Sequence, residues 1–108
     1  MRIISWNVNG IRSIAKKDFF RDLEKLDPDV LCLQETKAAE PEVKSVLESM
    51  KGYVVHANSS KARKGYSGTA VISRTEPVDV LFDMGLNHHD QEGRIIAAEF
   101  EKFFVVSV

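Results

Sequence analysis

Apolar and polar positions divide the chain into an N-terminal part, where helix and strand patterns alternate, and a later part with strand patterns only. The mostly apolar run 3–6 stops at the amide of Asn7, and the apolar run 30–33 is followed within two residues by Glu35. Between them, apolar residues recur at helical spacing within residues 17–26. A strand, a helix and a strand connected in this way form a right-handed crossover with parallel strands. We therefore expect Asn7 and Glu35 side by side at a sheet edge where α/β proteins bind ligands.

The rest of the chain predicts one more helix followed by a series of strands. Pro41 suits the first turn of a helix, and apolar residues at helical spacing continue from it to Gly52. After Gly52, apolar runs bounded by turn residues predict strands and a final hairpin. The strands are expected at residues 53–56, 69–73, 78–82, 95–100 and 103–108. The predicted fold class is α/β, with one mixed sheet and two helices on one of its faces.

Composition is ordinary for a globular protein. The chain has 108 residues, 44% of them hydrophobic and 29% charged, which allows at most one domain. The net charge of −1 gives no overall sign of nucleic-acid binding, although a local basic groove is enough to hold a phosphate backbone. The single Cys32 lies in an apolar run, which predicts a buried thiol. No signal peptide and no membrane-spanning run is found, so we expect no membrane partner and a cytoplasmic or nuclear location.

The expected pair of Asn7 and Glu35 is the first candidate for chemistry. A carboxylate and an amide oxygen in one place are ligands that a hard cation such as Mg²⁺ accepts. The alternative is structural, since an Asn can merely turn the chain and a Glu at a strand end can be simply solvated.

A long polar loop expected at residues 85–93 carries His88, His89 and Asp90. These residues could be mistaken for a zinc cluster, but they have no Cys partner and no tetrahedral ligand spacing. We expect a surface loop there.

Four stretches of the chain carry a family resemblance: residues 5–12 (SWNVNGIR), 27–37 (DPDVLCLQETK), 64–68 (KGYSG) and 90–96 (DQEGRII). In this order and at this spacing they resemble the motifs of the exonuclease III family. Its members are Mg²⁺-dependent apurinic/apyrimidinic (AP) endonucleases of DNA base excision repair, within the endonuclease/exonuclease/phosphatase superfamily. The resemblance covers essentially the whole chain.

The resemblance implies a four-layered α/β sandwich, in which two sheets pack face to face between helices. It makes residues 1–108 the N-terminal part of a single endonuclease/exonuclease/phosphatase domain, truncated at Val108. This half is expected to supply one sheet with its helices, with the second sheet missing. The face meant for that second sheet would be uncovered, so we expect the fragment to self-associate through it.

The resemblance also implies a catalytic role for Glu35 and Asn7. Glu35 would be the magnesium ligand, with Mn²⁺ as an alternative ion, and Asn7 would orient the same metal and the scissile phosphate. The metal would neutralise charge on the phosphoryl oxygens and on the departing 3′ oxygen. Asn9 departs from the acidic residue that some family members carry at its position, which leaves the metal environment open.

Three basic residues close to the same strand ends are candidates for DNA binding. Arg12 and Lys37 match positions that the family uses against DNA phosphates, and Lys16 follows Arg12 by four positions. Together they would form the positive rim that sequence-independent binding needs. The alternative for each of them is plain solvated surface.

The loop 64–68 and Arg94 complete the expected DNA-binding set. Glycines on both sides of Tyr66 would let the backbone at Gly65 approach a phosphate and push the ring outward. In related enzymes this loop enters the minor-groove side of DNA that is bent around an extruded abasic sugar. A tight turn with a packed ring is the alternative for Tyr66. Arg94 would order the DNA-facing loops, and a structural ion pair is its alternative.

The family's other catalytic motifs, Tyr-x-Pro-Asn, Gly-Asp-x-Asn and Ser-Asp-His, do not occur in the chain. The resemblance therefore implies that the full-length parent hydrolyses the phosphodiester 5′ to an abasic site in duplex DNA, with 3′ exonuclease activity as a further expectation. Residues 1–108 alone are expected to be inactive, because the catalytic base is missing. Another nuclease or phosphatase of the superfamily and a non-catalytic nucleic-acid-binding module are the alternative functions.

Overall fold

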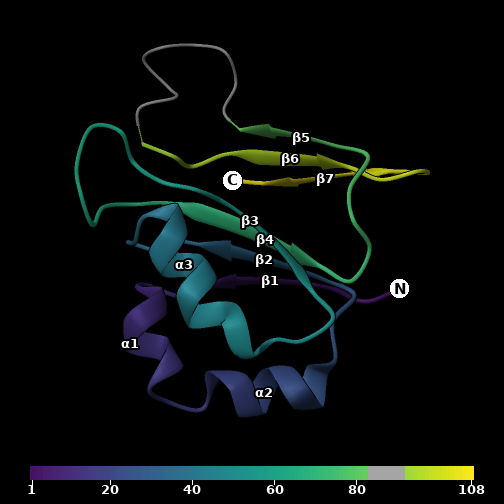
Figure 1. Cartoon of the computed structure of the whole chain (residues 1–108), viewed down its shortest axis with the longest axis horizontal. Helices are drawn as coiled ribbons and strands as arrows, with labels where there is room; N and C mark the ends of the chain where they lie inside the picture. The colour runs from purple at the N-terminus through teal and green to yellow at the C-terminus, as the bar shows by residue number, and fades with distance from the viewer. Residues whose placement is uncertain (83–91) are drawn as a thin grey trace.

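The computed structural model describes residues 1–82 and 92–108 and contains two sheets with helices on one side (Figure 1). The loop residues His88, His89 and Asp90 lie outside the described residues. The predicted crossover is confirmed: β1 (Ile3–Asn7) and β2 (Val30–Gln34) are parallel and adjacent, and Asn7 pairs with Gln34 at their C-terminal ends.

Two helices connect these strands where the sequence predicted one. The amphipathic α2 (Phe19–Leu26) buries Phe19 and Leu23 and ends at Asp27, whose φ of 46° is left-handed and whose N–H donates to the carbonyl of Leu23. The short α1 (Ile11–Ala15) precedes it and buries Ile11. The later helix was predicted correctly: α3 (Glu40–Val46) has a Pro in its first turn and continues as the 3₁₀ helix η1 (Leu47–Ser49).

The first sheet has the strand order β1-β2-β4-β3 and carries the helices on one face. Its later strands, β3 (Val54–Asn58) and β4 (Thr69–Ser73), are antiparallel, and β4 is also antiparallel to β2. The core between this sheet and the helices contains Phe19, Leu31, Leu33, Val43 and Ile72, all nearly inaccessible to solvent.

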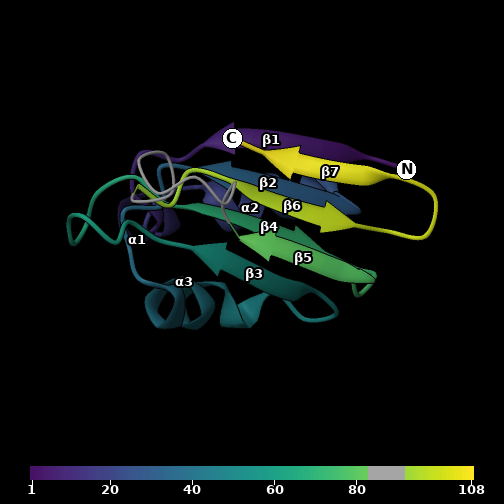
Figure 2. The same ribbon diagram turned by 90° about the horizontal axis from the view of Figure 1, so that it is seen from above.

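The predicted mixed sheet with helices on one face is confirmed, but the expectation that the second sheet is missing is wrong. Residues of β5 (Asp79–Phe82), β6 (Ile96–Glu99) and β7 (Phe104–Ser107) form a second, antiparallel sheet. Both edges of β4 are already paired, to β2 and β3, so no later strand can join it there. The three strands instead cover the other face of the first sheet (Figures 1 and 2).

A second core fills the space between the two sheets. Val30, Cys32 and Val71 of the first sheet pack with Ile96 and Ala98 of β6. Burial alternates along β6 and β7, as it does in strands with one covered face. The predicted burial of Cys32 is confirmed, and this burial raises the pKa of its thiol. The predicted β6–β7 hairpin is also confirmed.

The face of the first sheet that was expected to be uncovered is therefore covered by the second sheet. The exposed apolar side chains lie instead on the outer face of the second sheet. Leu81, Phe104 and Val106 are 59%, 65% and 57% exposed there. None of the helices in the described part of the chain has the length and apolar character needed to cross a membrane.

Candidate active site

The segment that follows β2 connects two loops at one edge of the first sheet. The carbonyl oxygen of Glu35 accepts the N–H of Gly10 at 2.8 Å, and that of Thr36 accepts the N–H of Ile11 at 2.9 Å. On the other side, the N–H of Lys37 donates to the carbonyl oxygen of Ser67 at 2.7 Å. Residues 35–37 are thus fixed between the loop after β1 and the loop before β4.

Backbone strain is concentrated at this junction. Five non-glycine residues in the described part of the chain have positive φ angles, and four of them lie here. They are Asn9, Glu35, Lys37 and Ser67, with φ between 48° and 56°. Such conformations persist only where surrounding contacts enforce them, and they occur preferentially at functional sites.

Asn7 and Glu35 lie side by side, as their strand positions predicted. The amide nitrogen Nδ2 of Asn7 donates to Oε2 of Glu35 at 2.5 Å, and the amide oxygen Oδ1 accepts the N–H of Asn9 at 3.1 Å. These contacts fix the orientation of the Asn7 amide. Both side chains line a cavity of about 210 Å³. Its other lining residues are Gln34, Ser67, Gly68, Arg94 and Val108.

The oxygen ligands at this cavity are few, which restricts the metal that they fit. No cluster of three or more His, Cys, Asp or Glu side chains occurs among residues 1–82 and 92–108. The carboxylate of Glu35 suits Mg²⁺, which keeps several waters and takes only one or two protein carboxylates, and the amide oxygen of Asn7 has a second lone pair besides the one that accepts from Asn9. The same oxygens offer neither the thiolate or imidazole ligands of a zinc site nor the oxygen cage of a calcium site.

The three predicted basic residues Arg12, Lys16 and Lys37 line one depression next to the cavity. It has a volume of about 590 Å³ and also includes Gly65 and Asn9 in its wall. The Nζ of Lys37 donates to Oδ1 of Asn9 at 2.5 Å. The neutral Asn9 thus accepts a hydrogen bond from the Lys37 ammonium, whereas an acidic residue at the same position would form an ion pair with it. Arg12 forms an exposed ion pair with Glu42 at 2.8 Å.

Tyr66 is held by two arginines and belongs to neither hydrophobic core. The guanidinium carbons of Arg63 and Arg94 lie 4.9 and 5.5 Å from the centroid of its ring. Nη2 of Arg94 donates to the Tyr66 hydroxyl at 3.0 Å, and Nε donates to Oε2 of Glu92 at 2.6 Å. The hydrogen bond from Arg94 is the main cause that lowers the pKa of the Glu92 carboxyl. The side chain of Tyr66 is half-buried in this arrangement.

Sequence reasoning missed several residues that build the site. Gly68 has a φ of +91°, and a Cβ atom there would lie 2.4 Å from Oγ1 of Thr36, which is fully buried and has no hydrogen-bond partner. Gln34 donates through Nε2 to the hydroxyls of Ser5 and Ser107, both at 3.1 Å, and so connects the two sheets beside the cavity. The place of Gly68 in the motif 64–68 could have indicated its role, whereas nothing in the sequence indicates that Gln34 contacts Ser5 and Ser107.

Comparison with known proteins identifies the family. A model of the Endonuclease/Exonuclease/phosphatase family matches residues 4–108. The chain is 48% identical over 109 residues to an exodeoxyribonuclease of Bacillus subtilis (strain 168), and the match covers 100% of this chain and 42% of that protein. It is 44% identical over 108 residues to the DNA repair nuclease APEX1 of Danio rerio, with 99% of this chain and 35% of that protein covered.

A solved structure supports the same conclusion for the fold. An AP endonuclease from Archaeoglobus fulgidus matches with a TM-score of 0.79 and 33% sequence identity, over 95% of this chain and 38% of that chain. The chain thus spans less than half the length of the relatives to which it is similar. Because the family match extends over almost all of its residues, the chain belongs to the Endonuclease/Exonuclease/phosphatase family.

Proposed function

We propose that residues 1–108 form the N-terminal part of a single nuclease domain that hydrolyses the phosphodiester 5′ to an abasic site in duplex DNA, with 3′ exonuclease activity in addition. The observation that carries the proposal is the Asn7–Glu35 pair at 2.5 Å, held by strained backbone next to a basic depression. The names of the similar proteins, an exodeoxyribonuclease, a DNA repair nuclease and an AP endonuclease, support this choice of substrate.

Glu35 and Asn7 would hold Mg²⁺, or Mn²⁺ in its place. When bound, the metal would neutralise charge on the scissile phosphate and on the departing 3′ oxygen. The chain's own contribution is positional: Glu35 supplies the negative charge, and the Asn7 amide is kept in one orientation by its contacts to Glu35 and Asn9. The described residues that line the cavity at Glu35 and the basic depression include no Asp and no His, so we find no general base in either place.

The basic depression would hold the DNA backbone. Arg12, Lys16 and Lys37 are cations at its wall, and Gly65 offers a backbone position that has no side chain to block a phosphate. Contacts of this kind fix the register of a duplex without reading its sequence. Tyr66 lies next to Gly65 and would contact the minor-groove side of the same duplex.

The proposal is tested with the full-length protein and a labelled duplex that carries one tetrahydrofuran abasic-site analogue. Glu35→Gln should lower Mg²⁺-dependent incision by about 100-fold or more, since a lost phosphoryl-clamping ligand costs several kcal/mol of transition-state stabilisation. The matched control Glu48→Gln changes an exposed carboxylate on η1 and should cut at the wild-type rate. Residues 1–108 alone should show no incision.

Two results would contradict the proposal. Wild-type incision by Glu35→Gln at saturating Mg²⁺ would remove Glu35 from the metal site. Hydrolysis of phosphate monoesters or of RNA, without incision at the abasic site, would place the protein in another branch of the family.

We also propose that isolated residues 1–108 self-associate through the outer face of the second sheet. Leu81, Phe104 and Val106 are exposed together on that face, and contiguous apolar patches of this kind are uncommon on monomers. Sedimentation of the fragment should show dimers or larger species, and Val106→Lys should shift it towards the monomer. A wild-type monomer at high micromolar concentration would refute this.

A further inference from the structure

Three side chains connect the Tyr66 loop to the segment that enters β6. Arg94 donates to the Tyr66 hydroxyl at 3.0 Å and to the Glu92 carboxylate at 2.6 Å. We call Tyr66, Arg94 and Glu92 the site-end cluster. Tyr66 and Arg94 are 28 positions apart in the sequence, so the cluster is a tertiary contact and not a local turn.

Residues at the end of β3, from which the Tyr66 loop departs, also contact the segment that enters β6. Nδ2 of Asn58 donates to the carbonyl oxygen of Ile95 at 3.1 Å. A Cβ atom on Gly93 would lie 2.2 Å from the carbonyl carbon of Ser59, so the backbones touch at a point where only glycine fits. The segments are therefore packed together independently of Arg94, and the cluster acts on an existing contact.

Arg94 also reaches the candidate metal cavity. It lines the cavity that Asn7 and Glu35 line, whereas Tyr66 does not. One guanidinium group is thus shared between the aromatic ring and the cavity wall.

We propose that Arg94 is a positioning residue that fixes Tyr66 at the rim of the Glu35 cavity, and that Glu92 holds Arg94 in this orientation. The proposal rests on the proposed function, because Tyr66 matters at this place only if DNA lies against it. Arg94 then serves DNA binding through Tyr66, without contact to the reacting phosphate.

The chemistry of the guanidinium group explains why arginine is needed. Its planar fork presents Nε to Glu92 and Nη2 to Tyr66 at the same time, which the single ammonium of a lysine cannot do with the same geometry. The cation also lies over the electron-rich ring face, as does Arg63. Glu92 balances one of these two positive charges and accepts the shorter of the two hydrogen bonds, at 2.6 Å against 3.0 Å.

The experiment compares three conservative variants in the full-length protein: Tyr66→Phe, Glu92→Gln and Arg94→Lys. Each should raise KM for the abasic duplex by about 3- to 10-fold and leave kcat within about twofold of wild type, because binding is lost equally in ground and transition states. The double variant Tyr66→Phe with Arg94→Lys should be no worse than the weaker-binding single variant, because both changes break one contact.

Arg74→Lys is the matched control. Arg74 stacks on Tyr53 and donates to its hydroxyl at 3.1 Å, and its side chain is 45% exposed against 44% for Arg94. If the site-end cluster were only a stabilising contact, both lysine variants would lower Tm alike and neither would change KM. An unchanged KM in Arg94→Lys, or a loss confined to kcat, overturns the proposal.

A spectroscopic readout separates this proposal from the proposed function. In the full-length protein labelled with 3-fluorotyrosine, the ¹⁹F signals of the two tyrosines of residues 1–108 are assigned with Tyr53→Phe and Tyr66→Phe. Arg94→Lys and Glu92→Gln should shift the Tyr66 signal and leave the Tyr53 signal in place. If the Tyr66 signal shifts but the wild type neither binds nor cuts abasic DNA, the proposed function fails; if DNA is cut and the signal does not shift, the positioning role fails.

Discussion

Among residues 1–82 and 92–108, a tyrosine, an arginine and a carboxylate meet in the same arrangement twice, at opposite ends of the strands. The site-end cluster is Tyr66, Arg94 and Glu92, and the far-end cluster is Tyr53, Arg74 and Asp27. In both, the arginine lies over the tyrosine ring, at 5.5 Å and 5.1 Å, and donates to its hydroxyl, at 3.0 Å and 3.1 Å. In both, the same guanidinium forms an ion pair with the carboxylate.

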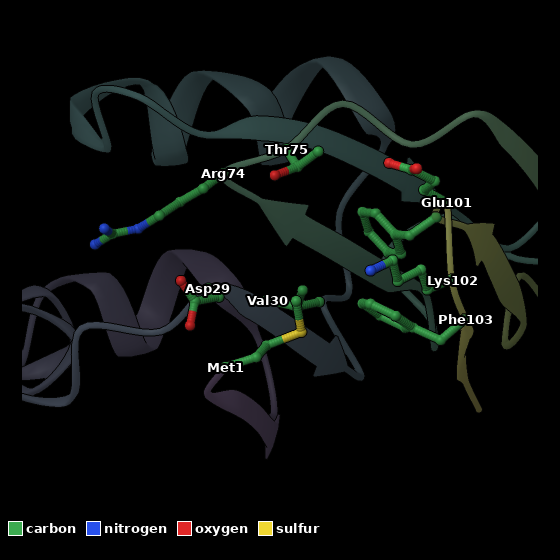
Figure 3. Close-up of a pocket in the computed structure, with 9 residues that line it drawn as sticks. Met1, Asp29, Val30, Arg74, Thr75, Glu101, Lys102 and Phe103 are labelled. Carbon is green, nitrogen blue, oxygen red and sulfur yellow. The ribbon is translucent and has the colours of Figure 1, made fainter.

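The surroundings of the far-end cluster make it structural. Asp27 ends α2, Tyr53 precedes β3 and Arg74 follows β4, so the three side chains connect ends of regular elements. The Tyr53 hydroxyl also donates to the carbonyl oxygen of Pro28 at 2.6 Å. In Figure 3 the Arg74 side chain extends away from Phe103, on the other side of a cavity of about 230 Å³.

The surroundings of the site-end cluster differ in kind. Its members come from two loops, and Arg94 shares a cavity with Glu35 and Asn7. The backbone nearby is strained at Glu35 and Ser67, whereas the far end has one left-handed non-glycine residue, Asp27, at an ordinary helix end. A trio of side chains therefore does not define a role by itself; the strained backbone and the adjacent carboxylate distinguish the candidate site.

The largest expected effect comes from adding one methyl group at the site end. Gly68→Ala would place Cβ 2.4 Å from the buried Oγ1 of Thr36 at a φ of +91°. We expect a loss of about 2 to 4 kcal/mol in the free energy of unfolding, from overpacking and backbone strain together, and loss of incision as the backbone at Glu35 moves. Urea unfolding and the incision assay measure the two effects.

Gly52→Ala is the control at the far end. Gly52 has a φ of +83°, and a Cβ atom there would meet nothing within 4 Å. The cost should be the left-handed conformation alone, about 1 to 2 kcal/mol, with incision unchanged. Equal effects of the two substitutions would show that backbone strain, and not the contact with Thr36, determines the site geometry.

An intermediate effect is expected from removing each arginine head group. Arg74→Met should lower Tm by a few degrees, because it separates α2 from the ends of β3 and β4. Arg94→Met should lower Tm less and should weaken binding to abasic duplex, measured by fluorescence anisotropy. The comparison fails if Arg74→Met weakens DNA binding as much as Arg94→Met does.

The sequence predicted those parts of the fold and site that depend on local pattern. The apolar runs before Asn7 and Glu35 show that these residues lie at the C-terminal ends of their strands. The crossover rule then places both side chains at one edge of the sheet. The five-residue α1 was missed because one turn has too few positions to show a period. The basic residues were located together because all three lie close in sequence to these strand ends.

The division into two sheets could not be predicted from the same patterns. The alternation of buried and exposed residues in β6 and β7 fits a hairpin in either sheet. The hairpin joins a second sheet because both edges of β4 are already paired. The contact between Arg94 and Tyr66 likewise joins residues that are 28 positions apart. Nothing in the neighbours of either residue indicates the other, so this part of the site required the structure.

The smallest expected effect concerns pH and would separate the two clusters further. The hydrogen bond from Arg94 is the main cause that lowers the pKa of Glu92 below its ordinary value of 4.5. Because the folded-state pKa is below that of the unfolded chain, the ion pair contributes fully above about pH 4.5 and is lost as the pH falls through the lower, folded-state value. The change in Tm should be small and should decrease with salt, since both side chains are more than two-fifths exposed.

The ¹⁹F signal of Tyr66 reports this loss more sensitively than Tm does. Between about pH 6 and about pH 3 it should shift with a midpoint below the ordinary Glu value, as protonated Glu92 loses its contacts to Arg94 and to the Tyr66 hydroxyl. In Glu92→Gln the ¹⁹F chemical shift of Tyr66 should not change over this pH range, because the glutamine side chain has no negative charge that protonation could remove. A pH response that persists unchanged in Glu92→Gln would mean that another acid controls the position of Tyr66. The carboxylate in the site-end cluster would then be as structural as Asp27 is at the far end.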